Sequence, residues 1–219
     1  YNLQNTPFAD LGRDAEIDNY LRRFYFVNNE DKKCYFNPIQ RTDLGLMTQK
    51  NFGILAWQMG GGKTAGALAW AKYKPQRNTF VISASLAINL TWVPFLIKNN
   101  IKFKHIKTMQ DVYDIEQGDW LLLSFDFLTR YEKQLRDYVK AQSHRVNLIF
   151  DESDEITNNA TKRTRSVLSI FKRVKRKLLT TGTTTRNNIG ELYSQLELLY
   201  NNSCNFMSWS EFYYVEEKS

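Results

Sequence analysis

The residues Leu55 to Thr64, with the sequence LAWQMGGGKT, have types and spacing that suit phosphate binding. They overlap the apolar run from Phe52 to Ala56 and precede a segment of helix formers, Ala65 to Tyr73. A strand, a glycine-rich loop and a helix are therefore expected in that order. Glycines let backbone N–H groups approach a polyphosphate, and the positive end of the following helix dipole favours an anion. The alternative is a glycine-rich turn in which the Lys-Thr pair is incidental.

Two residues after the glycines could act directly on a nucleotide. Lys63 can place a point charge on the β- and γ-phosphates, and the Thr64 hydroxyl can hold Mg²⁺. The usual first glycine of such a loop falls on Trp57. The glycines that remain are Gly60, Gly61 and Gly62.

A second group of candidate residues follows the apolar run from Val146 to Phe150. Asp151 and Glu152 come directly after this run, at the sheet edge where α/β proteins bind ligands. An aspartate there can orient the Mg²⁺ held by Thr64, and the next glutamate can polarise an attacking water. Acidic residues after a strand are common, so a solvated loop is the alternative. The phosphate-binding loop upstream favours the catalytic interpretation.

Short apolar runs alternate with helical segments along the chain. Strands are expected at 52–56, 79–84, 103–107, 120–125, 146–150 and 177–181. Helices are expected at 14–26, 37–49, 63–73, 86–98, 126–142, 161–174 and 189–200. Pro94 should kink or break the helix that contains it. This alternation predicts an α/β fold, with a mostly parallel sheet covered by helices on both faces.

The composition limits the class of protein. The chain has 219 residues, 42% hydrophobic and 24% charged, as is typical of a globular protein. No apolar run approaches the roughly 20 residues that a membrane span needs, so no membrane partner is expected. Two cysteines and two histidines cannot form a zinc site alone and suggest a reducing, intracellular compartment such as the cytoplasm or nucleus. The net charge of +7 suits a polyanionic partner. The first residue is Tyr, so a processed or partial chain is expected.

The segment from Leu178 to Leu192, LLTTGTTTRNNIGEL, is the third informative stretch. With the two stretches above, it resembles the Swi/Snf-type ATPases of helicase superfamily two. The first motor lobe of that family has a DExx box, then Thr-Gly-Thr-Pro, paired asparagines and Glu-Leu. The matching residues are Thr181, Gly182, Thr183, Asn187, Asn188, Glu191 and Leu192. The loop is similar to the family's Leu-Ala-Asp-Glu-Met-Gly-x-Gly-Lys-Thr, which adds Met59 to the nucleotide-binding residues.

Other segments extend the resemblance over residues 37–200 in the correct order. VISASLAINLTW resembles the strand, loop and helix that end in Asn/Ser-x-x-Trp, which places Trp92 on the family's tryptophan. WLLLSFDFLTRY resembles the strand followed by Ser-Tyr-Glu-x-Leu, with Phe125 in place of the tyrosine. NPIQ, which ends at Gln40, resembles the family's Arg-Pro-x-Gln.

The resemblance implies a RecA-like lobe that binds ATP and Mg²⁺ within a DNA-dependent ATPase that moves along double-stranded DNA. It implies catalytic roles for Lys63, Asp151 and Glu152, and it implies that Thr181, Gly182 and Thr183 couple hydrolysis to movement. Ser85 and Ser124, in loops after strands, would contact duplex phosphates. A second RecA-like lobe, or a partner chain, would supply arginine fingers, so this chain alone should hydrolyse ATP poorly. The implied divisions are a helical extension at 1–36, the lobe at 37–200 and a tail at 201–219.

Three departures from the family keep other functions open. Trp57 and Gln58 replace an acidic pair, Ser153 and Asp154 give DESD, and Thr184 replaces the proline of the third motif. A nucleotide-gated module that switches a partner without translocation is one alternative. A helicase that unwinds DNA or RNA is the other.

Two further assignments stay open from the sequence alone. By resemblance Gln40 would recognise the adenine edge, but it also lies three residues after Asn37, where a glutamine can cap the start of a helix. The run from Thr161 to Lys177 has eight basic residues and no acidic one. It can be a solvated face, a contact for nucleic-acid phosphates or a docking surface for a second lobe. The candidate phosphate contacts in it are Lys172, Arg173 and Lys175. Trp70, Trp92, Trp120 and Trp209 are expected in the core.

Overall fold

The chain folds around one parallel sheet, and the computed structural model describes residues 14–156, 161–182 and 192–199. The sheet has six strands in the order β3-β8-β7-β4-β6-β5, and every neighbouring pair is parallel. The strands are β3 (Phe52–Leu55), β4 (Asn78–Ser83), β5 (Phe103–His105), β6 (Trp120–Ser124), β7 (Val146–Asp151) and β8 (Arg176–Thr180). All six predicted strands are present, with ends shifted by one or two residues at most.

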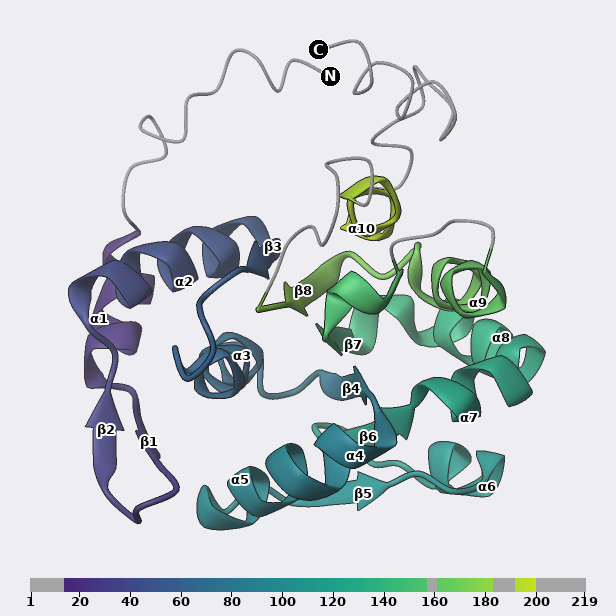
Figure 1. Ribbon diagram of the computed structural model, residues 1–219, viewed down its shortest axis with the longest axis horizontal. Helices are drawn as coiled ribbons and strands as arrows, with labels where there is room; N and C mark the ends of the chain where they lie inside the picture. Colours follow the sequence, from purple (N-terminus) through teal and green to yellow (C-terminus); the bar gives the residue numbers. More distant parts are fainter. Residues whose placement is uncertain (1–13, 157–160, 183–191, 200–219) are drawn as a thin grey trace, which may run out of the picture.

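Helices cover both faces of the sheet, as predicted (Figure 1). One face packs against α1 (Ala15–Arg23), α2 (Pro38–Lys50), α3 (Lys63–Lys72) and α5 (Val93–Lys98). The other packs against α6 (Met109–Tyr113), α7 (Phe125–Arg130), α8 (Glu132–Gln142), α9 (Lys162–Phe171) and α10 (Leu192–Leu199). Alternate residues of each strand point to opposite faces. On β4, Phe80 and Ile82 belong to one core cluster and Val81 to the other.

The segment expected as one helix at 126–142 is two helices, which corrects the prediction. The backbone leaves the helical conformation at Tyr131, with φ −114° and ψ 28°, between α7 and α8. The Tyr131 ring lies 4.7 Å from that of Phe127, centroid to centroid. Phe127 lies outside the helical stripe formed by Leu128 and Leu135, and the break allows all of these side chains to be buried.

The segment around Pro94 is helical but changes type along its length. A short α4 (Ser85–Ala87) is followed by a π-helical turn, Ile88–Trp92, and then by α5. Pro94 lies in the first turn of α5, directly after the π-helical turn, and its missing N–H removes one donor from the helical series. The expected break therefore takes the form of a π-turn, and this turn contains Trp92.

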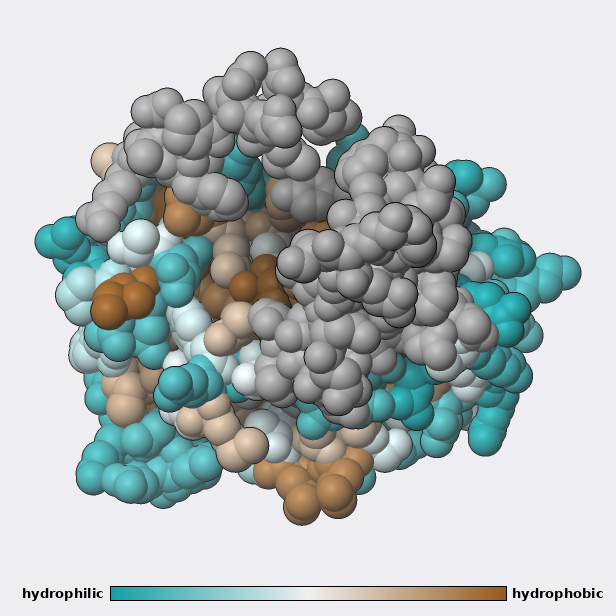
Figure 2. Space-filling model, turned by 45° about the horizontal axis from the view of Figure 1, so that its top comes forward, coloured by the Kyte–Doolittle hydropathy of each residue, from teal (hydrophilic) through white to brown (hydrophobic). Residues whose placement is uncertain are grey.

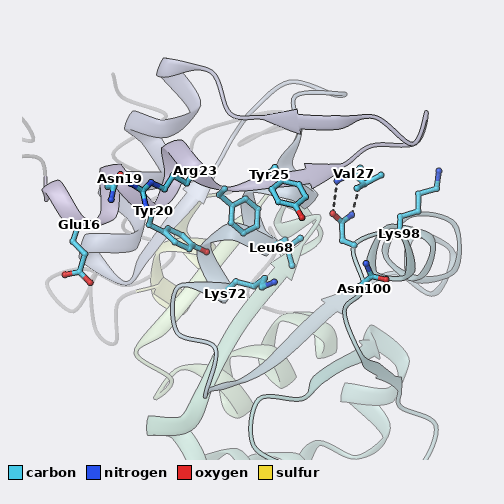
Figure 3. Close-up of a pocket in the computed structure, with 12 residues that line it drawn as sticks. Glu16, Asn19, Tyr20, Arg23, Tyr25, Val27, Leu68, Lys72, Lys98 and Asn100 are labelled. Atoms are coloured by element: carbon cyan, nitrogen blue, oxygen red, sulfur yellow. Dashed lines mark hydrogen bonds between the residues drawn. The ribbon is translucent and has the colours of Figure 1, made fainter.

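The N-terminal part contains a hairpin that the sequence analysis missed. Its strands, β1 (Tyr25–Val27) and β2 (Lys33–Tyr35), are short and half-exposed, so they show little apolar alternation. The Asn99 side chain bonds both backbone groups of Val27, at 2.8 and 3.1 Å, and ties the hairpin to the end of α5 (Figure 3). A cavity of about 570 Å³ lies beside this contact, lined from α1, β1, α3 and α5. A domain boundary at residue 37 stays a prediction.

Side chains add hydrogen bonds to the last carbonyls of α3, two of which also accept from the backbone N–H groups of Tyr73 and Lys74. The donors to Ala69, Trp70 and Ala71 are Tyr20, Arg176 and Asn147, at 2.7, 2.5 and 3.3 Å respectively. The Arg176 guanidinium also lies over the Trp70 ring, 4.0 Å from its centroid. Burial, with a smaller contribution from Arg77, lowers the pKa of Arg176 to about 9. A cation at this end of α3 interacts favourably with the negative end of the helix dipole.

The next residue of β8, Lys177, is buried on the opposite face of the sheet. Its Nζ donates to the carbonyl of Lys172 at 2.8 Å and to that of Leu198. Burial lowers the pKa of Lys177 to about 7 from the ordinary value of 10.5. Between about pH 7 and pH 10.5, this lysine is therefore protonated in the unfolded chain but has lost its proton in the folded chain.

We predict that Lys177→Met flattens the pH dependence of stability between about pH 7 and pH 10.5. Because the pKa of Lys177 is lowered on folding, its contribution to the free energy of unfolding rises with pH across this range, by at most about 1.4 kcal/mol per pH unit. The free energy of unfolding of the methionine variant, minus that of the wild type, should therefore decrease as the pH rises. Urea unfolding at several pH values measures this, with the exposed Lys175→Met as control. An identical pH profile for Lys177→Met and the wild type would contradict the prediction.

Candidate nucleotide-binding site

The glycine-rich loop joins the end of β3 to the start of α3. Gly62 is the N-cap of α3 with φ +81°, and Gly60 has φ +77°. These values suit glycine because a side chain is strained there. The N-terminal turn of α3, with Lys63 and the half-buried Thr64, faces the carboxyl edge of the sheet. Met59 is 96% exposed at the tip of the loop.

Lys63 is held by the loop itself. Its Nζ donates to the carbonyls of Trp57 at 2.9 Å and of Gln58 at 3.2 Å. Gly182 approaches closely, since a Cβ built on it would lie 3.9 Å from this nitrogen. The loop after β3 and the segment after β8 thus meet at the Lys63 ammonium group. A bound phosphate would take the place of the two carbonyls as its partner.

Gln40 has two structural roles that bear on its open assignment. Its Oε1 accepts from the N–H of Asn37, and its N–H donates to the Asn37 side chain, each at 2.9 Å, in a capping box at the start of α2. Its Nε2 donates to the Gly61 carbonyl at 3.0 Å. The capping interpretation is confirmed. The same side chain also braces the loop, which the sequence analysis did not predict.

Trp57, where the usual first glycine is replaced, forms a second brace between α2 and the loop. Its indole N–H donates to Asp43 Oδ2 at 2.9 Å. Its ring covers Gly66 on α3 so closely that a Cβ there would lie 3.0 Å from Cζ3 and 3.3 Å from Cη2. The bulky residue is therefore accommodated by a glycine on the helix beneath it.

The Asp151 carboxylate, at the end of β7, accepts hydrogen bonds from three elements. Oδ2 accepts from the Ser83 hydroxyl at 3.1 Å and from the Trp92 indole N–H at 2.9 Å. Oδ1 accepts from the Thr180 hydroxyl at 2.6 Å. Thr180 pairs with both Leu55 and Asp151 in register, so it links the strand before the loop to the strand of the carboxylate.

The sequence analysis missed Ser83 and Thr180 and expected only a core role for Trp92. Trp92 is fully buried, as are Trp70 and, almost fully, Trp120, so that expectation is confirmed. Its bond to Asp151 adds a polar role. A signal was available, because hydroxyl residues end the apolar strands β4 and β8 at the edge where Asp151 lies. Strand pairing was needed to show that they converge.

The remaining residues of DESD contact the segments that follow them in sequence. Ser153 donates to Gln195 Oε1 on α10 at 2.7 Å. Asp154 Oδ1 accepts from the buried Thr181 hydroxyl at 2.9 Å. Glu152 has φ +54°, an uncommon conformation for a residue with a side chain. The expected coupling residue Thr181 is thus bonded directly to the acidic box.

The Asp151 carboxylate has room for a divalent cation. A carboxylate offers about four acceptor positions, and the three donors above leave one for a ligand or for a water in the shell of Mg²⁺. Mg²⁺ commonly keeps several waters and takes one or two carboxylates together with substrate phosphates. Thr64 and Asp151 are therefore suitable residues to hold this ion beside a nucleotide.

The expected nucleic-acid contacts are divided between two regions. Ser85 is exposed at the start of α4, beyond the end of β4. The Ser124 hydroxyl accepts from the Phe127 N–H at 3.2 Å and caps α7. Lys172, Arg173 and Lys175 are exposed at the other end of the molecule, between α9 and β8. Two further residues of the basic run, Arg176 and Lys177, are buried in the sheet.

Several predicted residues lie outside the described residues. They are Thr183, Thr184, Asn187, Asn188, Glu191, Trp209, the first residues of the predicted helix at 189–200 and the tail at 201–219.

We predict that Gly66→Ala destabilises the protein by about 1–3 kcal/mol, because the added methyl group would press on the Trp57 ring. The effect should be smaller in a Trp57→Ala background, where that ring is absent and alanine has the better helix propensity. Urea unfolding of both single variants and the double variant gives the coupling free energy. Strictly additive costs would show that the two residues do not interact.

The chain is similar in sequence to known proteins along most of its length. No protein-family model matches the chain. It is 28% identical over 202 residues, 89% of its length, to the Bos taurus SWI/SNF-related matrix-associated actin-dependent regulator of chromatin subfamily A-like protein 1. It is 30% identical over 166 residues, 73% of its length, to the DNA annealing helicase and endonuclease ZRANB3 of the same organism. These matches span 20% and 15% of the relatives, so the chain covers a small part of each.

Solved structures show the same fold. The SWI2/SNF2 ATPase core domain of Sulfolobus solfataricus superposes with a TM-score of 0.63 at 25% identity, covering 82% of this chain and 37% of that one. The same core in complex with double-stranded DNA gives 0.62 at 23% identity, covering 82% and 38%. The UvsW helicase of bacteriophage T4 gives 0.53 at 13% identity, covering 77% and 59%, and supports the fold alone. By its loop, its acidic box, its parallel sheet and these relatives, the chain belongs to the Swi/Snf-type ATPases of helicase superfamily two and is a first RecA-like motor lobe.

Proposed function

We propose that this lobe binds ATP and Mg²⁺ between the glycine-rich loop and Asp151, as part of an ATPase that moves along duplex DNA. The observation that supports this most directly is the meeting of three segments at one sheet edge. These segments carry Lys63 at the start of α3, Asp151 at the end of β7 and the residues from Thr180 to Gly182. Thr180 donates to Asp151, and Gly182 lies beside the Lys63 ammonium group. This is the edge where open α/β sheets bind their ligands.

The proposed chemistry is transfer of the γ-phosphoryl group to water. The bond between the γ-phosphorus and the bridging oxygen breaks while a bond to the water oxygen forms. Lys63 and the N–H groups at the start of α3 stabilise the negative charge of the phosphates. In this proposal Glu152, whose backbone has φ +54°, orients and polarises the water. Mg²⁺, when bound by Thr64 and Asp151, would neutralise phosphate charge.

The link between Asp154 and Thr181 supports a coupling role for the segment after β8. Thr181 follows Thr180, which bonds Asp151, so the acidic box and this segment are joined at two consecutive residues. A change in the position of Asp151 on hydrolysis would therefore reach Thr181 and Gly182 directly. Duplex DNA as the track, contacted near Ser85 and Ser124, and an intracellular, DNA-associated location are part of the proposal. Among the described residues, no helix has the length and apolar character needed to cross a membrane.

We predict that Lys63→Ala weakens binding of Mg²⁺-ATP by roughly 10- to 100-fold, the loss of one charge-assisted hydrogen bond of about 1.5–3 kcal/mol. Isothermal titration calorimetry measures the dissociation constant. Lys72→Ala removes an exposed lysine from the far end of the same helix and should leave it unchanged. Equal affinity of Lys63→Ala and the wild type would refute the assignment of the loop.

We also predict turnover well below about 1 s⁻¹ for this chain alone, with or without duplex DNA, compared with the usual enzyme range. The reason is that an arginine finger contributes about 10³–10⁵ in rate and is expected from a second lobe. A phosphate-release assay with saturating Mg²⁺-ATP tests this, with Lys63→Ala as background. DNA-stimulated turnover above that limit would mean that the chain is catalytically complete.

A further inference from the structure

A basic groove lies between α8 and α9, away from the nucleotide site. Its cavity of about 500 Å³ is lined by five cationic side chains and one carboxylate, Asp137. The cations are Arg136 and Lys140 on α8, Arg165 on α9, and Lys172 and Arg173 just after it. We propose that this groove binds the phosphodiester backbone of a nucleic acid, as a contact separate from the loops at the carboxyl edge of the sheet.

The cations come from both helices that border the groove. Arg136 and Lys140 are four residues apart on α8, about 6 Å along the helix axis. Arg165 lies on α9, and Lys172 and Arg173 follow directly after its last residue, Phe171. The Arg136 guanidinium donates to Ser169 Oγ at 3.3 Å, which joins the two helices across the groove.

Most of this charge is not neutralised by the protein. Arg136 contacts Asp137 at 4.0 Å, the limit for an ion pair, and both side chains are exposed. Among the residues that the structure describes, no carboxylate pairs with Lys140, Arg165, Lys172 or Arg173. All five cationic side chains are exposed. Hydrophilic residues accordingly dominate the right-hand edge of the molecule, where α8 and α9 lie (Figure 2).

The groove is remote from the site that holds Lys63 and Asp151. Both α8 and α9 start near the carboxyl edge of the sheet and end near its amino edge, where β7 and β8 begin. Arg136 and Arg165 lie in the first halves of α8 and α9, and Lys140, Lys172 and Arg173 lie closer to the amino edge. None of the residues that line the groove belongs to the glycine-rich loop. A ligand bound there would contact neither the glycine-rich loop nor Ser85 and Ser124, so this site adds to the duplex contacts of the proposed function.

The lining favours a phosphate backbone over an acidic protein segment. Protein interfaces depend on buried aromatic and aliphatic anchors, whereas the described lining has no aromatic residue and only two aliphatic ones, Leu168 and Ile170. Three of its five cations are arginines, whose guanidinium groups match phosphate oxygens with two parallel hydrogen bonds. Cations repeated along two helices suit a linear polyanion with one phosphate per about 3.4 Å of each strand.

The choice of duplex DNA as the ligand of the groove rests on the proposed function. The contribution of the groove is tested separately, by the salt dependence of DNA binding. The probe is a fluorescent 20-base-pair duplex, and anisotropy gives the dissociation constant at several salt concentrations. The groove variant is Lys140→Gln/Arg165→Gln/Arg173→Gln. A control variant, Lys32→Gln/Lys50→Gln/Lys74→Gln, removes the same charge from exposed positions elsewhere. A charge-retaining variant, Arg165→Lys/Arg173→Lys, completes the set.

The slope of log K against log salt should become less steep by about 0.9 for each phosphate that the groove variant no longer neutralises. The control and charge-retaining variants should keep the wild-type slope. The groove variant should also bind Mg²⁺-ATP like the wild type, which separates this result from failure of the nucleotide site, tested by Lys63→Ala. Equal slopes for the groove and control variants would overturn the proposal. So would a groove variant that binds duplex like the wild type but no longer binds poly-glutamate, because the groove would then serve an acidic protein.

Discussion

Helix α3 is held at its C-terminal end, and the proposed nucleotide site depends on this constraint. At its C-terminal end, the half-buried Tyr20 and the buried Arg176 and Asn147 bond the last carbonyls. At its N-terminal end, the backbone N–H groups remain directed toward the carboxyl edge of the sheet, where a phosphate would meet them. Because Arg176 and Asn147 belong to neighbouring strands β8 and β7, the orientation of α3 is set by the same strands that place Thr180 and Asp151. The fold and the site are therefore stabilised by one set of contacts.

The register of the parallel strands determines which side chains meet at the carboxyl edge of the sheet. Leu55, Thr180 and Asp151 are successive partners across three strands. Ser83 and Trp92 then approach Asp151 from β4 and the π-helical turn. A carboxylate with donors on both oxygens cannot rotate without breaking several bonds, so its position is well determined before any ligand binds. Preorganisation of this kind is what electrostatic catalysis of phosphoryl transfer requires.

The sequence was sufficient to predict the alternating strands and helices, because buried parallel strands are continuous apolar runs that differ clearly from amphipathic helices. It was not sufficient for the hairpin of β1 and β2, whose strands are short and half-exposed, or for the break at Tyr131, which depends on ring packing. The loop and acidic box could be located from residue types and order. The donors around Asp151 could not, because the direction of one indole N–H and the pairing of strand ends are tertiary properties. Gln40 shows the same limit, since its capping bond to Asn37 was predictable from their spacing, whereas its bond to Gly61 joins residues 21 positions apart.

The close packing of Trp57 on Gly66 has a consequence for how this loop can change over evolutionary time. A side chain at position 66 and a large ring at position 57 compete for the same space, so a lineage acquires them in a particular order. Loss of the ring must come before gain of a larger residue on α3, and a return of the ring requires glycine first. Asp43 joins this group, since without the indole its carboxylate loses a hydrogen-bond donor. Homologues of this chain should therefore show correlated residue identities at these three positions, forming a small block that is inherited together.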